Sequence, residues 1–367
     1  MAEVWGRVVA LQANFCAVVP DGSAAGLVAP DASGAEVAPA SGSAGAGAPA
    51  RAAAAGPEDS PPAPSATPGA PQGPPPAPLL CTRRSRLDHA GLQVWVGDRV
   101  RLEGIDPASG RAAVAAVAPR RNLLSRPPVA NVARVVVVAS LVEPTLDPPQ
   151  LSRFLLSAEA CGAAVELVLS KADRVEAASL AAWCEELLGW GYEPLPVSSR
   201  SGAGLDALSR RLASPGPDGE AGGIAVLCGP SGAGKSSLLN ALCPALALRV
   251  APVSGRLRRG RHTTRHVELF PLASGALLAD TPGFNRPELP ADPAALAALF
   301  PELRRRLAGD PCRFRNCRHL DDPGCAAGTD WPRHGHYRQW LEELERDASP
   351  AQRSRSEGRL SRRGRAG

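Results

Sequence analysis

The stretch Gly229 to Ser236, GPSGAGKS, fits the phosphate-binding pattern G-x-x-x-x-G-K-[ST]. The apolar run 224–228 before it predicts a short buried strand, and residues 237–242 after it predict a helix. In that setting, consecutive backbone N–H groups and the helix N-terminus can hold phosphate oxygens. Lys235 would reach the β- and γ-phosphates, and the Ser236 hydroxyl would ligate Mg²⁺. The alternative, a glycine-rich turn with an incidental lysine, leaves the strand–loop–helix setting unexplained.

A second motif, DTPG at 280–283, follows another apolar run. Asp280 is predicted to hold Mg²⁺ through water, and the Gly283 N–H to sense the γ-phosphate. A third motif, SKAD at 170–173, follows the predicted strand 165–169, where GTPases usually carry N-K-x-D. An aspartate there accepts hydrogen bonds from guanine N1–H and the exocyclic amine, and so rejects adenine. Ser170 is shorter than asparagine but can still bond to the phosphate-loop backbone; the alternative is a surface turn.

The order of the motifs indicates a circular permutation. Ser198 and Ser199 end a short strand and are predicted to offer a backbone N–H to guanine O6. These residues and the motif at 170 precede the phosphate loop, whereas an ordinary GTPase has them after it. Strand ends still converge on one crevice when the chain order changes. The predicted nucleotide contacts are Ser170, Lys171, Ala172, Asp173, Ser198, Ser199, Gly229, Pro230, Ser231, Gly232, Ala233, Gly234, Lys235, Ser236, Ser237, Asp280 and Gly283.

The segment 255–265, GRLRRGRHTTR, is polar, basic and flanked by glycine, which is typical of a switch that orders on Mg²⁺ and γ-phosphate. Thr264 or Thr263 would be the metal-linked threonine, and His262 could position the attacking water. The predicted catalytic residues are His262, Lys235 and Thr264, and the predicted Mg²⁺ ligands are Ser236, Thr264 and Asp280. The alternative for the arginines is a solvated loop that touches RNA. Phe284 stands where Ras-like enzymes carry a water-orienting glutamine, so we expect slow intrinsic hydrolysis that a partner accelerates.

Four residues with the spacing C-x₄-C-x-H-x₅-C form a second chemical centre, namely Cys312, Cys317, His319 and Cys325. Three thiolates and one imidazole predict a closed, tetrahedral, structural Zn²⁺ site with no position for water. Phe314 and three arginines (313, 315 and 318) interleave with these ligands, which suits an RNA-facing knuckle. The alternative is a set of unrelated reduced cysteines, and His334 and His336 are more distant competing ligands.

The elements that must position these motifs divide into three parts. Residues 4–20 and 92–117 alternate like the strands of a small β-barrel. Residues 21–79, rich in Ala, Gly, Pro and Ser, predict a flexible insertion in one barrel loop. Alternating strands and helices predict an α/β domain with a mostly parallel sheet. We place the barrel at 1–120, the α/β domain at 121–288, a helical zinc-binding domain at 289–348 and a disordered basic tail at 349–367.

Composition limits the alternatives. Nine cysteines, an odd number, indicate a reducing compartment with one metal site. No run of eighteen apolar residues predicts a membrane span, and neither a secretory signal nor a transit peptide is apparent. The net charge is +5, and residues 351–367 hold six arginines against one glutamate. This tail would contact RNA phosphates or be a solvated terminus. Nothing in the sequence demands more than a monomer.

These motifs together resemble the ribosome small-subunit-dependent GTPase A family, the circularly permuted, YjeQ-type GTPases with an N-terminal OB-fold barrel. Five sequence segments carry the resemblance: RPPVANVARVVVV (126–138), QLSRFL (150–155), GRHTTRHVELFPL (260–272), DTPGF and CRFRNCRHLDDPGC. The first two look like those of cyanobacterial or plastid members. The resemblance implies a GTPase that binds the small ribosomal subunit late in assembly, hydrolyses GTP when stimulated by it, and leaves. The barrel and zinc domain would contact rRNA.

Two other functions remain possible from the sequence. One is a different P-loop enzyme such as an ATP-using kinase, against which Asp173 and the DTPG loop argue. The other is an RNA-binding zinc and OB protein with a weak or vestigial nucleotide site, against which intact Lys235, Ser236 and Asp280 argue. The expected location is the cytoplasm, with the chloroplast stroma as the alternative.

Overall fold

The computed structural model describes residues 3–12, 15–21, 78–83, 92–125, 128–215, 223–244, 267–272, 274–280, 287, 289 and 292–348. Several predictions fall outside these ranges, and they stay predictions. They concern most of the insertion, the basic tail, Gly283, and the switch segment with His262, Thr263 and Thr264.

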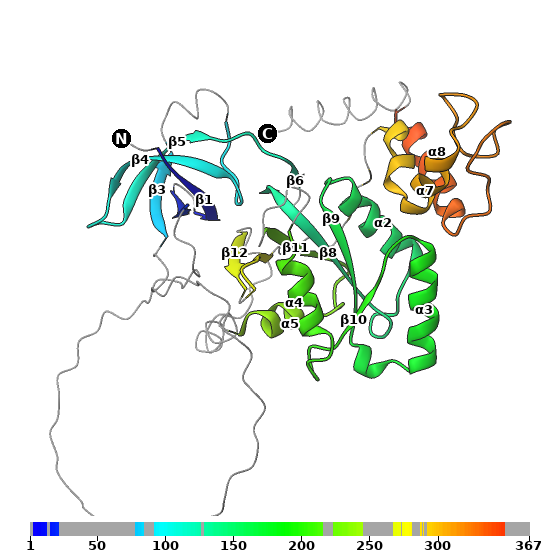
Figure 1. The fold of residues 1–367 in the computed structure, drawn as a ribbon, viewed down its shortest axis with the longest axis horizontal. Coiled ribbons are helices and arrows are strands. Elements are labelled where there is room, and N and C mark those ends of the chain that lie inside the picture. Colours follow the sequence, from blue (N-terminus) through cyan, green and yellow to red (C-terminus); the bar gives the residue numbers. More distant parts are fainter. Residues whose placement is uncertain are drawn as a thin grey trace, which may run out of the picture.

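Five strands at the N-terminus form the predicted barrel (Figure 1). β1 pairs antiparallel with both β2 and β4, and β3 pairs parallel with β5, so the order β1-β2-β3-β5-β4 closes on itself. Closure leaves no unpaired sheet edge, and the alternating inward side chains fill the interior. The strands are β1 (Val4–Leu11), β2 (Phe15–Pro20), β3 (Leu79–Arg83), β4 (Arg99–Asp106) and β5 (Arg111–Val117).

The central sheet has the order β10-β9-β8-β11-β13-β12, in which only β12 runs antiparallel to its neighbours within this sheet. β11, the strand before the phosphate loop, therefore lies between β8 and β13. Its strands are β8 (Val132–Ser140), β9 (Ala164–Ser170), β10 (Leu195–Val197), β11 (Ile224–Cys228), β12 (Glu268–Pro271) and β13 (Leu277–Asp280).

Helices cover both faces of the central sheet (Figure 1). α2 (Pro148–Glu159) and α3 (Ala177–Gly189) pack on one face, while α4 (Leu205–Ala213) and α5 (Lys235–Leu242) pack on the other. The side chains of β8 alternate between these faces: Val135 and Val137 pack with α2, and Val136 and Val138 pack with α4 and α5. Every residue of β8 is buried for this reason, as its continuous β-branched run predicts.

Backbone hydrogen bonds join the barrel to the central domain. β1 pairs antiparallel with β12 at Ala10 and Glu268, so the barrel strands and the central strands belong to one sheet. A hairpin of β6 (Leu123–Ser125) and β7 (Pro128–Ala130) lies between the two parts. Its Ala130 N–H donates to the Val96 carbonyl at 2.8 Å.

The C-terminal part consists of short helical elements around an aromatic core (orange in Figure 1). The elements are η2 (Pro293–Ala295), η3 (Ala297–Leu299), α7 (Pro301–Gly309) and α8 (His334–Ala348). Phe300, Trp331, Tyr337 and Trp340 lie in this core, and Leu156 of α2 completes it from the central domain.

Arg333 anchors the C-terminal part to the central domain and is fully buried. Its Nε and Nη2 each donate to a carboxylate oxygen of Glu302 in α7 at 2.6 Å, and its Nη1 donates to the Ser152 hydroxyl of α2 at 3.1 Å. Its guanidinium carbon lies 5.0, 5.5 and 4.8 Å from the ring centres of Trp190, Tyr192 and Phe300. Ion pair, hydroxyl and rings together compensate the buried charge.

Within the described ranges, no helix has both the length and the apolar character needed to cross a membrane.

Candidate nucleotide site and metal centre

The phosphate loop runs from the end of β11 into α5, as predicted. Gly229 has φ +137°, and a Cβ there would lie 2.1 Å from the Val138 carbonyl oxygen of β8. Gly234 has φ +92° and precedes the first residue of α5. Only glycine fits both positions without strain, because L side chains rarely adopt such angles. The loop is therefore held by close backbone packing against β8.

Lys235 begins α5 and turns back over the loop. Its Nζ donates to the Gly229 and Pro230 carbonyls at 2.7 Å each. Burial lowers the pKa of the ammonium, which is half-buried. Ser231, Ser236 and Ser237 are exposed in the loop and the first turn of α5. The loop and the start of α5 thus bring one cation and several exposed serines close together in the chain.

Ser170 at the end of β9 is buried and lies beside the phosphate loop. Its hydroxyl oxygen lies 3.0 Å from the Ala139 carbonyl oxygen of β8 and also within hydrogen-bond distance of the Ala233 carbonyl oxygen of the loop, so its one proton is shared between these two acceptors. The bond that the sequence predicts for a serine at this position is therefore present. It ties the ends of β8 and β9 to the phosphate loop.

The connection that follows β8 lies over the same loop. Lys171, at φ +56°, donates from Nζ to the Glu143 carbonyl, and the Glu143 carboxylate pairs with Arg174 at 2.9 Å. A Cβ on Gly232 would lie 3.4 Å from Cδ of Pro144. Residues 143–144 thus form one wall beside the phosphate loop, a wall that sequence patterns did not indicate.

Asp173 and Ser198 come together although they follow different strands. The pKa of Asp173 is held below its usual range, first by a hydrogen bond with the Ser198 side chain and then by the nearby charges of Arg200 and Arg174. Asp173 lies in the 3₁₀ turn η1 (Ala172–Arg174), and Ser198 follows β10. Because β10 and β9 are parallel neighbours, their ends bring an exposed, ionised carboxylate to the crevice edge.

Other predicted residues are placed only in part. Asp280 is the last residue of β13 and its backbone pairs with Glu268, while its side chain and the residues 281–286 lie outside the described part. The predicted Mg²⁺ set and the histidine for the attacking water therefore stay predictions.

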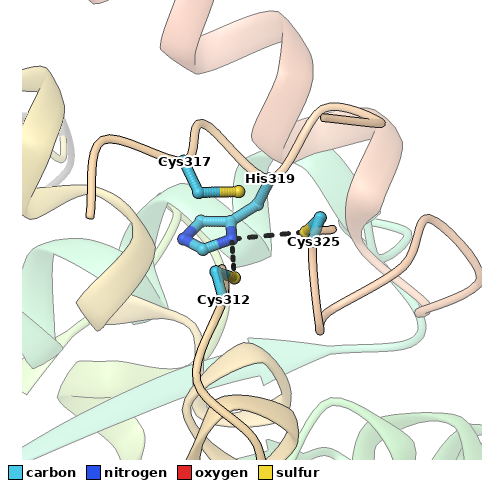
Figure 2. A group of neighbouring side chains, drawn as sticks. All are labelled: Cys312, Cys317, His319 and Cys325. Atoms are coloured by element: carbon cyan, nitrogen blue, oxygen red, sulfur yellow. Dashed lines mark hydrogen bonds between the residues drawn. The ribbon is translucent and has the colours of Figure 1, made fainter. Parts of the chain in front are cut away.

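The four predicted metal ligands meet in the loop between α7 and α8. The ligand atoms of Cys312, Cys317, His319 and Cys325 all lie within 4.8 Å of one another. Figure 2 shows the sulfurs of Cys312 and Cys325 beside Nδ1 of His319, at 3.5 and 3.6 Å. Soft thiolates with one imidazole fit Zn²⁺.

Neighbouring bonds hold the ligand loop in shape. The Asp322 carboxylate accepts from the Arg318 N–H at 3.0 Å and from the Leu320 N–H at 3.3 Å. His334 Nε2 lies 3.2 Å from the His319 carbonyl oxygen and so supports the loop. Among the described residues, neither His334 nor His336 belongs to the ligand group.

Comparisons with known proteins agree with this geometry. Residues 117–290 match the family description RsgA GTPase. A Synechococcus sp. (strain CC9605) protein called small ribosomal subunit biogenesis GTPase RsgA is 59% identical over 73% of this chain and 86% of that protein. The protein of that name from Trichormus variabilis is 49% identical over 72% of this chain and 69% of that protein.

The chain belongs to the RsgA GTPase family. As a family member it is a GTP hydrolase. Two solved structures have the same fold: YjeQ from Thermotoga maritima, with a TM-score of 0.66 over 94% of this chain and 99% of that one, and YloQ, a circularly permuted GTPase, with 0.64 over 95% and 97%. Their sequences are 23% and 24% identical to this chain. The barrel, the permuted GTPase domain and the Cys₃His region of the predicted fold are confirmed.

Proposed function

We propose that this GTPase acts in the biogenesis of the small ribosomal subunit, and that the subunit stimulates its hydrolysis of GTP. One observation carries the guanine assignment: Ser170 and Asp173 lie at the end of β9, where the Ser170 hydroxyl contacts the phosphate loop and Asp173 bonds with Ser198, although all three precede that loop in the chain. The partner is inferred from the relatives, whose names give them a role in biogenesis of that subunit. The place of action is the cytoplasm, where bacterial ribosomes assemble.

Nucleotide binding replaces hydrogen bonds that the phosphate loop makes within itself. Lys235 exchanges the carbonyls of Gly229 and Pro230 for phosphate oxygens, which are stronger acceptors for an ammonium. The carboxylate of Asp173 accepts from guanine, and its lowered pKa keeps it ionised for this. Ser170 keeps its bond to Ala233 and so fixes the loop relative to the base-binding strand ends.

Magnesium would be held by Ser236, Thr264 and Asp280, where it neutralises charge on the phosphates. His262 orients the attacking water. Since Phe284 stands in place of a water-orienting glutamine, the unstimulated rate is slow.

The Cys₃His group holds one structural Zn²⁺ and takes no part in catalysis. Around it, Arg313 stacks on Phe314 at 5.4 Å, and that ring is 51% exposed. An exposed aromatic with adjacent arginines suits single-stranded RNA, because bases stack on the ring while arginine pairs with phosphate. The zinc loop thus serves as one rRNA contact and the barrel as another.

The test is GTP hydrolysis by the purified protein, with and without isolated small ribosomal subunits, with ATP as the control nucleotide. We expect stimulation by the subunit that is specific to GTP. A Lys235→Ala variant should lose turnover under both conditions. Equal, slow hydrolysis with and without subunits would overturn the proposed partner, and turnover of ATP at the rate of GTP would overturn the guanine assignment.

A further inference from the structure

Two completely buried cysteines of the barrel lie opposite each other on neighbouring strands. Cys16 of β2 and Cys81 of β3 are direct partners in the antiparallel register, and both belong to the apolar core of the barrel. Their side chains therefore share one face of the β2–β3 pair. The Cys16 thiol donates to the Cys81 carbonyl at 3.6 Å, which places its sulfur beside the partner residue.

The backbone geometry of this pair matches that of a disulfide. Directly opposed residues of antiparallel strands have Cα atoms about 4.5–5.5 Å apart. A disulfide joins residues whose Cα atoms lie about 4.4–6.8 Å apart. A bond between the two sulfurs therefore needs side-chain rotation but no displacement of either strand. Among the strand pairings that the structure describes, no other one opposes two cysteines.

The two thiols are unreactive while the strands stay paired, but they lie close to the end of the ladder. Burial raises the pKa of Cys16 to about 11; burial, together with the nearby Cys16, raises the pKa of Cys81 to about 12. Disulfide exchange needs a thiolate that an oxidant can reach. The next pair, Phe15 and Thr82, is the last of the β2–β3 ladder, and both residues are exposed. Opening of this end therefore exposes the thiols without global unfolding.

A small anionic oxidant can approach this end of the barrel. A cavity of about 280 Å³ beside β12 is lined by Phe15, Arg83 and Val267, among others. Arg83 is exposed and follows Cys81 by two residues, and its charge counteracts part of the rise that burial causes in the pKa of Cys16. A disulfide that carries carboxylates, such as glutathione disulfide, is attracted by this cation.

We propose that Cys16 and Cys81 form a reversible disulfide, which locks β2 to β3 when the surroundings become oxidising. The thiolate of one cysteine attacks a sulfur of the small disulfide, and a mixed disulfide forms as one small thiolate leaves. The second cysteine then attacks the protein sulfur of this mixed disulfide and expels the other small thiolate. Each leaving thiolate takes up the proton that the attacking cysteine released. Two protein thiols are thus oxidised, and one small disulfide is reduced to two thiols.

This site goes beyond the proposed function, because its chemistry needs neither a nucleotide nor a ribosomal subunit. In a reducing compartment the dithiol is the resting state, since disulfides there are usually transient and redox-sensing. The bond closes residues 16–81 of the chain into a covalent ring. Closing so long a loop restricts the unfolded chain and stabilises the folded barrel.

The experiment treats the full-length, zinc-loaded protein with glutathione disulfide under native conditions. Mass spectrometry then maps the disulfides after the remaining thiols have been alkylated. We expect one dominant link, between the peptides of Cys16 and Cys81, which dithiothreitol removes. Oxidation should raise the thermal unfolding midpoint by at least about 5 °C. Cys16→Ser should abolish both the link and this shift, whereas Cys243→Ser, a change of another buried cysteine in the central domain, should keep both.

Three results would overturn the proposal. The first is that Cys16 and Cys81 of the wild type remain free thiols in glutathione disulfide. The second is a link that forms only at urea concentrations that unfold the protein, because opening of the ladder end would then be insufficient. The third is a shift of the midpoint that persists in Cys16→Ser and in a second variant, Cys81→Ala. The first two results come from the wild type, so they do not depend on whether a variant folds.

Discussion

Replacing Arg333 with methionine should destabilise the contact between the C-terminal part and the GTPase domain by about 4 kcal/mol. Methionine keeps much of the side-chain volume but removes the guanidinium that pairs with both oxygens of Glu302 at 2.6 Å. Glu302 is only 4% exposed, so its carboxylate would stay buried without its main partner. Breaking a buried pair from one side costs about 3–5 kcal/mol, and the rings of Trp190, Tyr192 and Phe300 can still pack against the methionine.

A double-mutant cycle separates the charge from the packing. Glu302→Met alone should cost a similar amount, because it leaves the guanidinium unpaired. The double variant Arg333→Met/Glu302→Met should lie within about 1 kcal/mol of the wild type, since apolar replacement of a whole buried pair is often neutral. Arg338→Met is the control: Arg338 is exposed on α8, and its change should stay within about 0.5 kcal/mol.

The assay is urea unfolding of the zinc-loaded protein followed by tryptophan fluorescence, because Trp190, Trp331 and Trp340 lie in or beside this contact. A cost below about 1 kcal/mol for Arg333→Met would refute the reasoning. So would a double variant whose cost equals the sum of the two single changes, because the charges would then act independently.

Three further predictions follow from the site. Ser170→Ala removes the hydroxyl that bonds to Ala139 and Ala233, and should weaken GDP binding about tenfold, measured with a fluorescent GDP analogue; an unchanged affinity would contradict this role. Ser198→Ala removes a hydrogen bond to the Asp173 carboxylate and should raise the pKa of Asp173. Because this pKa is lower in the folded than in the unfolded protein, the ionised carboxylate stabilises the fold at pH above the unfolded pKa. That stabilisation is lost as the pH falls through the folded pKa. Carbon-13 NMR of the Asp173 carboxyl tests this, and an identical titration in both proteins would rule it out. Cys317→Ser should lower bound zinc well below one ion per chain in metal analysis, while Cys184→Ser on α3 should retain it; full zinc in both variants would argue against the site.

The local parts of the site were predictable from the sequence because their geometry lies within a few residues. The phosphate loop needs glycine at positive φ directly between a strand and a helix, and both signals stand in eight consecutive residues. The Cys₃His ligands lie within fourteen residues of chain, so their spacing alone brings them together. The motif order gave the permutation, because sheet topology fixes where each strand end lies.

Contacts across the chain were not predictable in this way. An arginine is most often a surface residue, and no pattern indicates that Arg333 is buried with Glu302 and, 181 positions away, with Ser152. The same holds for the pairing of β1 with β12, because backbone hydrogen bonds carry no information about which strand is the partner. The wall formed by Glu143 and Pro144 beside the loop depends on the path that the chain takes after β8.

The sequence by itself thus determined which residues carry the chemistry: a phosphate loop, the carboxylate that we propose for guanine and a four-ligand metal group, each encoded by residue type at short spacing. Only the tertiary structure decided how these centres are joined. It placed the barrel on the edge of the central sheet, anchored the part that carries the Cys₃His group on α2 through one buried arginine, and created the cavity beside β12. The physical reason is that burial and charge pairing depend on which surfaces, distant in the sequence, pack against each other. The free energy of that packing depends on the whole fold.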